Sequence, residues 1–324
     1  MRHLLALAAL AAPLPAVAAP SEAGWQLVWS DEFNGPAIDP AKWSFEVDCW
    51  GGGNGERQCY TDHPSNARIT DGALVITALH EHVSGPAVPA SPRANPAKPG
   101  ALVNRDYTSA RLSTRGKAAW RYGRIELRAM LPQGQGTWPA IWMLPEANTY
   151  GPWAASGEID ILEAVNLGTP CKDCADGKED TILGTLHFGK PWPGNTHKGT
   201  EVHRPAVLAG FHTYAIEWQP DRIVWQLDGE TYAVRQRDEW FTSGSTAPGA
   251  PFDQPFHLIL NLAFGGGLPE SRGLKGVSDS NFPKRFLIDW VRVWQKPSET
   301  VGNAPTATAT TAAKAASAKQ EEGQ

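Results

Sequence analysis

The sequence has no excess of basic residues. Its 324 residues include 29 Lys and Arg against 34 Asp and Glu, a formal net charge of −5. Proteins that bind nucleic acid or anionic membrane surfaces usually carry a basic patch or stripe. No such cluster occurs here. The composition therefore argues against a nucleic-acid partner and against a membrane partner.

Long apolar runs are missing after the first 20 residues. That opening stretch, MRHLLALAALAAPLPAVAAP, has a basic start, a short apolar run broken by two prolines, and small residues near its end. It is too short to span a bilayer and predicts a signal peptide over residues 1–19, with secretion to the extracellular space or periplasm. Residues 297–324 lack large apolar groups and predict a disordered Ala/Thr-rich tail. Residues 20–296 then suit one large domain, although two smaller ones fit the length.

Cysteine is scarce, with four residues in two local pairs. Cys49 and Cys59 flank a glycine-rich loop, and Cys171 and Cys174 form a C-x-x-C motif in a polar loop. In an oxidising compartment such pairs favour small local disulfides or partly free thiols. A structural zinc site is the alternative, although the two pairs lie far apart in the sequence.

No long segment has the i, i+3, i+4 apolar spacing of an amphipathic helix. Instead, branched and aromatic residues recur at period two between turn residues, which is typical of half-buried strands. The segments are 72–79, 122–131, 213–219, 222–229, 257–264 and 285–294. They predict an all-β sandwich of two antiparallel sheets, with functional side chains on a concave outer face. The proline-rich segment 84–101 predicts a surface loop, with a domain linker as the alternative.

The segment GEIDILEAVN places Glu158, Asp160 and Glu163 within six residues. In a helix the three carboxylates would diverge. In a strand Glu158 and Asp160 share a face, but Glu163 is an odd number of residues from Glu158 and would point the other way. One extra residue at Ile161 and Leu162 would restore Glu163 to that face. The spacing therefore predicts a β-bulge.

Two glutamates about 5 Å apart on one face are what a retaining glycoside hydrolase requires. In this interpretation ionised Glu158 raises the pKa of Glu163, and Asp160 tunes both groups. A solvated outer face of a strand and a Ca²⁺ site are the alternatives that the spacing alone leaves open.

GEIDILEAVN resembles the catalytic signature of glycoside hydrolase family 16, E-[aliphatic]-D-x-x-E, in the bulged form of laminarinase-type endo-β-1,3-glucanases. Further segments look like family blocks in the family's order, and the similarity covers roughly Trp25 to Gln295. They are Tyr107–Pro145, Gly184–Asn195, Phe211–Gly229, Phe256–Gly266 and Phe286–Gln295. The resemblance implies a β-jelly-roll whose open cleft takes a glucan chain, over a catalytic domain at residues 20–296.

The resemblance also implies roles for single residues. Glu158 would be the nucleophile, Asp160 its electrostatic helper and Glu163 the general acid/base, with no cofactor needed for catalysis. The matching substrate-binding positions are Trp138 and Trp142, which would form a stacking platform, His187 beside the acid/base, and Asn66 and Arg111 on the donor side. The alternative for the platform is that one of the two tryptophans belongs to the core.

Many family members carry a structural calcium on the convex face, and the matching positions here are Glu32, the Gly72 carbonyl and Asp289. A buried, hydrogen-bonded Asp289 is the alternative. The chain departs from the family at Leu268, where laminarinases often have a donor-side tryptophan. Two cysteine-bearing inserts, at 49–59 and 170–180, are positioned to reshape the cleft rim.

Together these features predict a secreted, monomeric, retaining endo-glucanase that cuts internal β-1,3 links of laminarin-like or mixed-linkage β-glucan. Action on another polysaccharide and transglycosylation are the alternatives within the enzyme class. A non-catalytic glucan-recognition protein is the alternative from another class, although such relatives generally lack the two glutamates that this chain has.

Overall fold

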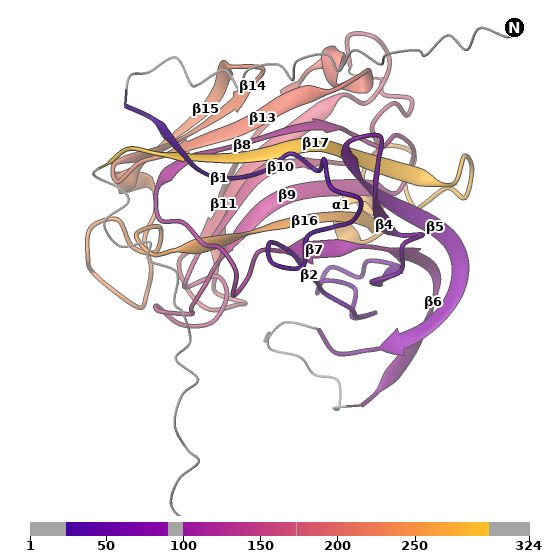
Figure 1. Cartoon of the computed structure of the whole chain (residues 1–324), viewed down its shortest axis with the longest axis horizontal. Helices are drawn as coiled ribbons and strands as arrows, with labels where there is room; N and C mark the ends of the chain where they lie inside the picture. Colours follow the sequence, from indigo (N-terminus) through magenta and orange to yellow (C-terminus); the bar gives the residue numbers. More distant parts are fainter. Residues whose placement is uncertain (1–23, 90–99, 173, 298–324) are drawn as a thin grey trace, which may run out of the picture.

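Two β-sheets face each other in the computed structural model, which describes residues 24–89, 100–172 and 174–297 (Figure 1). The predicted signal peptide and all but the first residue of the predicted tail lie outside these residues. The predicted sandwich is confirmed. Within the described residues every sheet pairing is antiparallel except that of β3 with β6.

The first sheet has ten strands in the order β15-β14-β13-β8-β17-β5-β6-β3, with β1 beside β17 and β4 beside β5. Its strands are β1 (Gln26–Asp31), β3 (Gln58–Tyr60), β4 (Ala67–Thr70), β5 (Ala73–Pro86), β6 (Leu102–Ser109), β8 (Gly123–Met130), β13 (His212–Trp218), β14 (Arg222–Leu227), β15 (Glu230–Gln236) and β17 (Lys284–Gln295).

The second sheet has seven strands in the order β12-β11-β10-β9-β16-β7-β2. They are β2 (Ser44–Phe45), β7 (Arg111–Ser113), β9 (Thr137–Pro145), β10 (Glu158–Ala164), β11 (Thr181–Phe188), β12 (Thr196–His203) and β16 (Phe256–Phe264). Among the described residues, helix is confined to α1 (Gly267–Ser271) and the 3₁₀ turns η1 (Pro205–Leu208) and η2 (Arg237–Glu239). Within the described part of the chain, no helix has the length and apolar character needed to cross a membrane.

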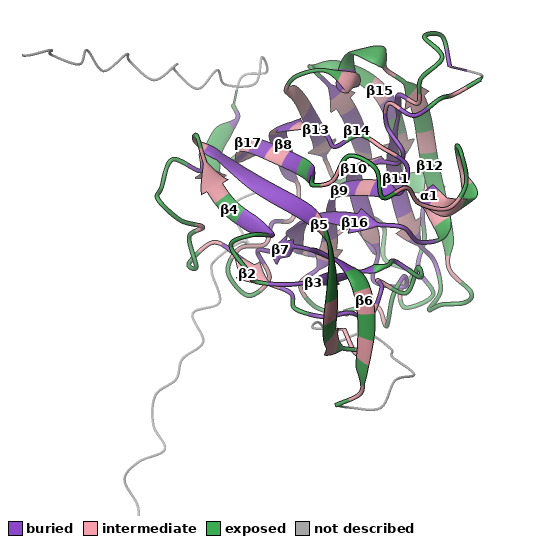
Figure 2. Cartoon of the chain, turned by 90° about the vertical axis from the view of Figure 1, so that its right-hand side faces the viewer, coloured by how far each residue is buried: buried purple, intermediate pink, exposed green. Residues whose placement is uncertain are grey.

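The core lies between the two sheets. Alternate residues of β9 point toward this core and toward the opposite, outer face of the second sheet. Ile141 and Met143 belong to the main core cluster, whereas Ala140 and Trp142 pack with Ile259 in a separate cluster on the opposite face. Figure 2 shows β16 buried in the middle of this sheet and β12 exposed at its edge. The second sheet therefore has an outer face on which side chains are available for a site.

The predicted loop over 84–101 begins too early, whereas its end agrees with the start of β6 at Leu102. Ser84, Gly85 and Pro86 continue β5 and pair with Asn104, Val103 and Leu102. Pro86 is tolerated there because it is the last residue of the strand. Since β5 and β6 are neighbours in one sheet, the segment between them connects two strands of the same sheet. Residues 90–99 lie outside the described part.

Both cysteine pairs are disulfides, Cys49–Cys59 and Cys171–Cys174, which confirms the prediction of local bridges over a four-cysteine zinc site. The first bridge closes a loop that packs against α1. The Gly267 N–H donates to the Asn54 carbonyl at 2.8 Å, and Arg57 pairs with Glu270. Leu268, which stands in place of the family's donor-side tryptophan, lies half-buried in α1.

Candidate active site

Strand β10 carries the predicted bulge. Against β11, Asp160 lies opposite Thr185 and Glu163 opposite Leu183, so three residue steps on β10 match two on its partner. Ile161 and Leu162 are consecutive yet both lie in the main core, 1% and 0% exposed. Because the bulge turns both side chains inward, Glu163 returns to the face of Glu158 and Asp160.

His187 of β11 brings two of the carboxylates together. It pairs with Glu158 across the strands, and its Nε2 lies 3.2 Å from Asp160 Oδ2 and 3.9 Å from Glu158 Oε1. Burial opposes its charge, but these carboxylates outweigh burial and raise the pKa of His187 to about 9. Calcium prefers oxygen ligands, and the third member of this cluster is an imidazole, so the cluster differs from the calcium site considered from the sequence.

Glu163 has a different hydrogen-bond donor. Trp138 Nε1 donates a hydrogen bond to Glu163 Oε1 at 2.9 Å. Burial, followed by the charge of Asp160, raises the pKa of Glu163 to about 7. The raised pKa agrees with the sequence interpretation, but its source differs, because burial and Asp160 take the part assigned to Glu158. Burial and the charge of Glu158 likewise raise the pKa of Asp160 to about 6.

The two predicted platform residues share the outer face but differ in exposure. Trp138 is half-buried, whereas Trp142 is only 8% exposed and its Nε1 donates to Asn261 Oδ1 at 2.6 Å. The guanidinium of Arg111 lies 5.6 Å from the centre of the Trp142 ring. Trp142 is therefore largely covered, which favours the alternative that one of the two tryptophans belongs to the core.

Asn66 and Arg111 were expected to contact sugar hydroxyls, and the structure places both inside the protein. Asn66 is 0% exposed; its amide donates to the Thr77 carbonyl and Thr108 Oγ1 and accepts from Thr61. No surface or amide hydrogen remains for a ligand, so that prediction is wrong.

Arg111 is 3% exposed and lies 4.4 Å from the centre of the Tyr60 ring. Its guanidinium pairs with Glu46 and Glu56 at 3.4 and 4.0 Å. The expectation that Arg111 lines an open donor site is therefore not met, and Arg111 instead supports Trp142 from within the protein.

Comparison with known proteins identifies the family. The family model for Glycosyl hydrolases family 16 matches residues 61–292. A beta-glucanase of Rhodothermus marinus is 42% identical over 277 residues, which cover 84% of this chain and 85% of that protein. The chain belongs to glycosyl hydrolase family 16. It is therefore a glycoside hydrolase.

A solved structure and a second curated protein extend the comparison. The X-ray structure of the laminarinase from Rhodothermus marinus matches with a TM-score of 0.68 at 41% identity, covering 84% of this chain and 98% of that one. The predicted jelly-roll is thereby confirmed. Glucan endo-1,3-beta-glucosidase A1 of Niallia circulans is 37% identical over 86% of this chain, but the chain spans only 39% of that protein's length.

The calcium positions implied by the family 16 resemblance are occupied by ion pairs. Arg292 donates to both oxygens of Glu32, at 3.0 and 2.8 Å, and Arg128 pairs with Asp289. Gly72 precedes β5. Because two guanidinium groups already neutralise the two carboxylates, this donor set does not fit a calcium ion as it stands.

Sequence reasoning missed two contributors to the family 16 site. Trp153 Nε1 donates to Glu158 Oε2 at 2.7 Å, and its ring lies 5.8 Å from that of His187. Its signal was a tryptophan five residues before the first glutamate of the motif. Glu56, 4% exposed, accepts from Gln58 and Tyr60 and lies 4.0 Å from Arg111. Nothing in the sequence marked that buried network.

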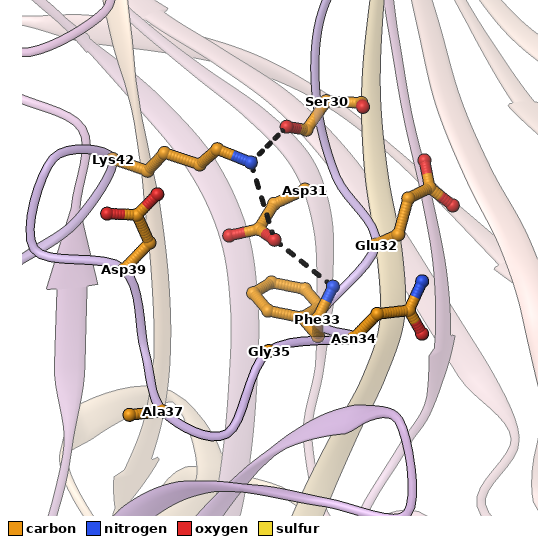
Figure 3. Close-up of a pocket in the computed structure, with 9 residues that line it drawn as sticks. All are labelled: Ser30, Asp31, Glu32, Phe33, Asn34, Gly35, Ala37, Asp39 and Lys42. Atoms are coloured by element: carbon orange, nitrogen blue, oxygen red, sulfur yellow. Dashed lines mark hydrogen bonds and ion pairs between the residues drawn. The ribbon is translucent and has the colours of Figure 1, made fainter.

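A pocket at the end of β1 lies apart from these residues (Figure 3). Several of its polar groups are hydrogen-bonded or ion-paired to each other. Lys42 donates to the Ser30 carbonyl at 2.7 Å and lies 3.6 Å from Asp31 Oδ1, which also accepts from the Phe33 N–H. The second oxygen of Asp31 accepts from Trp43. The pocket is a structural feature of the N-terminal segment.

Proposed function

We propose that this family 16 enzyme is a retaining endo-β-1,3-glucanase that uses Glu158 as nucleophile and Glu163 as general acid/base. One observation carries the proposal: the bulge sets two glutamates on the same face in different environments. Glu158 accepts a hydrogen bond from the Trp153 indole and lies beside protonated His187. Burial instead raises the pKa of Glu163 to about 7. Such divergence separates an acid from a nucleophile.

In the first step the Glu158 carboxylate attacks the anomeric carbon while neutral Glu163 donates its proton to the departing glycosidic oxygen. The Trp153 hydrogen bond fixes the direction of the Glu158 carboxylate. Trp138, bonded to Glu163, orients the acid and offers an indole face to a sugar ring. The covalent bond formed replaces the glycosidic bond broken.

In the second step Glu163, now a carboxylate, takes a proton from a water molecule that attacks the glycosyl-enzyme and releases Glu158. The Asp160–His187 pair acts on the pKa of Glu163 in two opposite directions. Its negative member opposes ionisation of Glu163, and its positive member favours the carboxylate form of its neighbours. This balance keeps the proton on Glu163 exchangeable near neutral pH.

The substrate class follows from the relatives. Proteins named as a beta-glucanase and as a glucan endo-1,3-beta-glucosidase match most of this chain, which supports β-1,3-glucan as the substrate and mixed-linkage glucan as a second one. We further propose that the enzyme acts as a monomer after secretion directed by residues 1–19. Incubation with laminarin, lichenan and agarose separates the glucanase from its alternatives. The expected products on laminarin are oligosaccharides that first appear as the β-anomer.

Two variants test the residue roles. Glu158→Gln should lower laminarin hydrolysis by at least about 10³-fold, because no nucleophile remains. Glu163→Gln should lower it by about 10²–10⁴-fold on laminarin, with azide restoring turnover of an activated glycoside. Hydrolysis at the wild-type rate by Glu158→Gln would contradict the assignment. Binding of laminarin without hydrolysis by the wild type would instead support the glucan-recognition alternative.

A further inference from the structure

The C-x-x-C loop brings a second group of ligand-type side chains together, away from the catalytic residues. Ligand atoms of Cys174, Glu179, Asp180 and His203 all lie within 4.8 Å of one another. Asp180 precedes β11, and His203 ends β12. His187 lies at the other end of β11, about 20 Å away at the rise of a strand. The group is therefore separate from the catalytic site.

Asp180 is the observation that points to a ligand. It is 0% exposed, and its Oδ1 lies 2.7 Å from His203 Nδ1. Its other oxygen, Oδ2, is buried without a hydrogen-bond partner among the described residues. A buried carboxylate oxygen left unpaired is costly, and a bound cation would satisfy it. The adjacent Glu179 adds a second carboxylate, whose Oε1 accepts from the Thr181 N–H at 3.0 Å.

Cys174 supplies a ligand of a different kind. In the structure its sulfur is bonded to Cys171, and a disulfide sulfur is a poor metal ligand because the thiolate is the binding form. A thiol or phosphine reductant supplies two electrons and, with two protons, converts the bridge to two thiols while the reductant is oxidised. When a metal ion binds, the Cys174 thiol loses its proton and becomes the thiolate ligand.

We propose that Cys174, Glu179, Asp180 and His203 form a zinc site that becomes available when the Cys171–Cys174 disulfide is reduced. Sulfur, imidazole nitrogen and carboxylate oxygen are the ligands zinc prefers, in tetrahedral geometry. Bonds of about 2.0–2.3 Å would place ligand atoms roughly 3.3–3.7 Å apart, so the group needs shifts of about 1 Å. The His203 side chain is 55% exposed, which gives the ion a path from solvent.

This site differs from the four-cysteine zinc site considered from the sequence. It uses one cysteine and takes no ligand from the Cys49–Cys59 bridge. Reduction followed by zinc binding would replace the disulfide within the 170–180 loop by a metal cross-link between that loop and the end of β12. The catalytic residues take no part in either state.

Cys171→Ser gives the cleanest test, because it frees the Cys174 thiol without a reductant and leaves Cys49–Cys59 intact. Co²⁺ is the first probe, since a cobalt–thiolate bond gives a charge-transfer absorption in the near ultraviolet. We expect Cys171→Ser to bind one Co²⁺ with that absorption, and to bind Zn²⁺ at least about 100-fold more tightly than the oxidised wild type. Wild type reduced with a phosphine should behave like the variant.

The matched control uses the exposed His82, which forms a similar pair with Asp106 at 2.9 Å but has no further ligand beside it in the described structure. Adding His203→Gln to Cys171→Ser should abolish the cobalt absorption, whereas adding His82→Gln should leave it unchanged. Laminarin hydrolysis by every variant checks that each is folded. Absence of a thiolate–cobalt band in folded Cys171→Ser, or an equal band after His203→Gln is added, would overturn the proposal.

Discussion

At the scale of single residues, the site depends on two carboxyl groups whose charged forms are opposed by burial. Glu163 and Asp160 have pKa values raised to about 7 and about 6, chiefly because burial removes solvent from their carboxylates. For a carboxyl group, a raised pKa in the folded state means that ionisation destabilises the fold. The raised pKa values therefore lower the stability of the fold at neutral pH, and they keep a proton on Glu163 that the proposed catalytic steps use.

The first prediction concerns the stability of Glu163→Gln. Below about pH 4.5 Glu163 is protonated in both folded and unfolded chains, so the substitution should change little. As pH rises from about 4.5 to about 7 the unfolded chain ionises while Glu163 in the folded chain stays largely protonated, so wild type loses stability that the neutral amide keeps. Above about pH 7 Glu163 is ionised in both states and the loss is complete. We expect Glu163→Gln to be more stable by about 1–3 kcal/mol at pH 8.

Urea unfolding at pH 4 and pH 8 measures this difference. Glu230→Gln is the control, because its side chain is 74% exposed and should show no such pH dependence. Equal stability of Glu163→Gln and wild type at both pH values would show that burial does not oppose the charge of Glu163.

The second prediction concerns His187, whose positive charge favours the ionised form of Glu163. His187→Gln removes that charge, so the pKa of Glu163 should rise further and the alkaline limb of the kcat profile should move to higher pH. A merely structural role would lower kcat without moving the limb. His197→Gln serves as control, because the His197 ring lies tilted 5.6 Å from that of His187 while no contact with the catalytic carboxylates is seen within the described structure. An unmoved limb in His187→Gln contradicts the role.

At the scale of strands, the sequence predicted the elements and the bulge because both follow from local alternation. Glu158 and Glu163 differ by an odd number of residues, and only an extra residue can set them on one face. Asn66, Trp142 and Arg111 could not be placed in this way. Their exposure is decided by partners far along the chain, such as Thr108 for Asn66 and Asn261 for Trp142.

The ion pairs at the calcium positions could not be foreseen from the sequence for the same reason. The arginine that pairs with Glu32 is 260 residues away, and the one that pairs with Asp289 is 161 residues away. A motif shows that carboxylates are present at matching positions. It does not show which cation of the chain reaches them once β1, β8 and β17 lie side by side.

The third prediction is that deletion of Ile161 keeps Glu163 on the catalytic face. Without that residue, Asp160 and Glu163 would be two steps apart, as their partners Thr185 and Leu183 on β11 already are. The deletion should cost about 2–4 kcal/mol, since Ile161 is 1% exposed. It should retain laminarin hydrolysis within about 100-fold of wild type, the range expected of a small displacement.

Ile161→Ala is the matched control, because it removes a similar apolar area and keeps the bulge. Comparing the two variants separates the loss of packing from the loss of the extra residue. A folded deletion variant as inactive as Glu163→Gln would mean that the bulge, and not only the shared face, sets the distance between the glutamates.

At the scale of the whole molecule, the last strand of the described chain lies in the middle of its sheet. β17 pairs with β5, with β8 and also with β1. These three strands come from the first half of the chain, and without β17 the first sheet would be interrupted between them. Phe286, Ile288, Val291 and Val293 are each 0% exposed. Burying these four is worth on the order of 6–10 kcal/mol, comparable with the whole stability of a domain.

The fourth prediction follows from that position. A chain ending at Pro283 should be insoluble, because β5 and β8 would expose unpaired edges and the core would lose its central strand. A chain ending at Pro297 should melt within about 1 °C of the full chain and hydrolyse laminarin equally well, since every strand of both sheets in the described structure lies before that residue. Expression, melting temperature and hydrolysis distinguish the two cuts. Loss of activity in the longer chain would assign the tail a part in folding or catalysis, and a soluble, active shorter chain would show that the sandwich closes without β17.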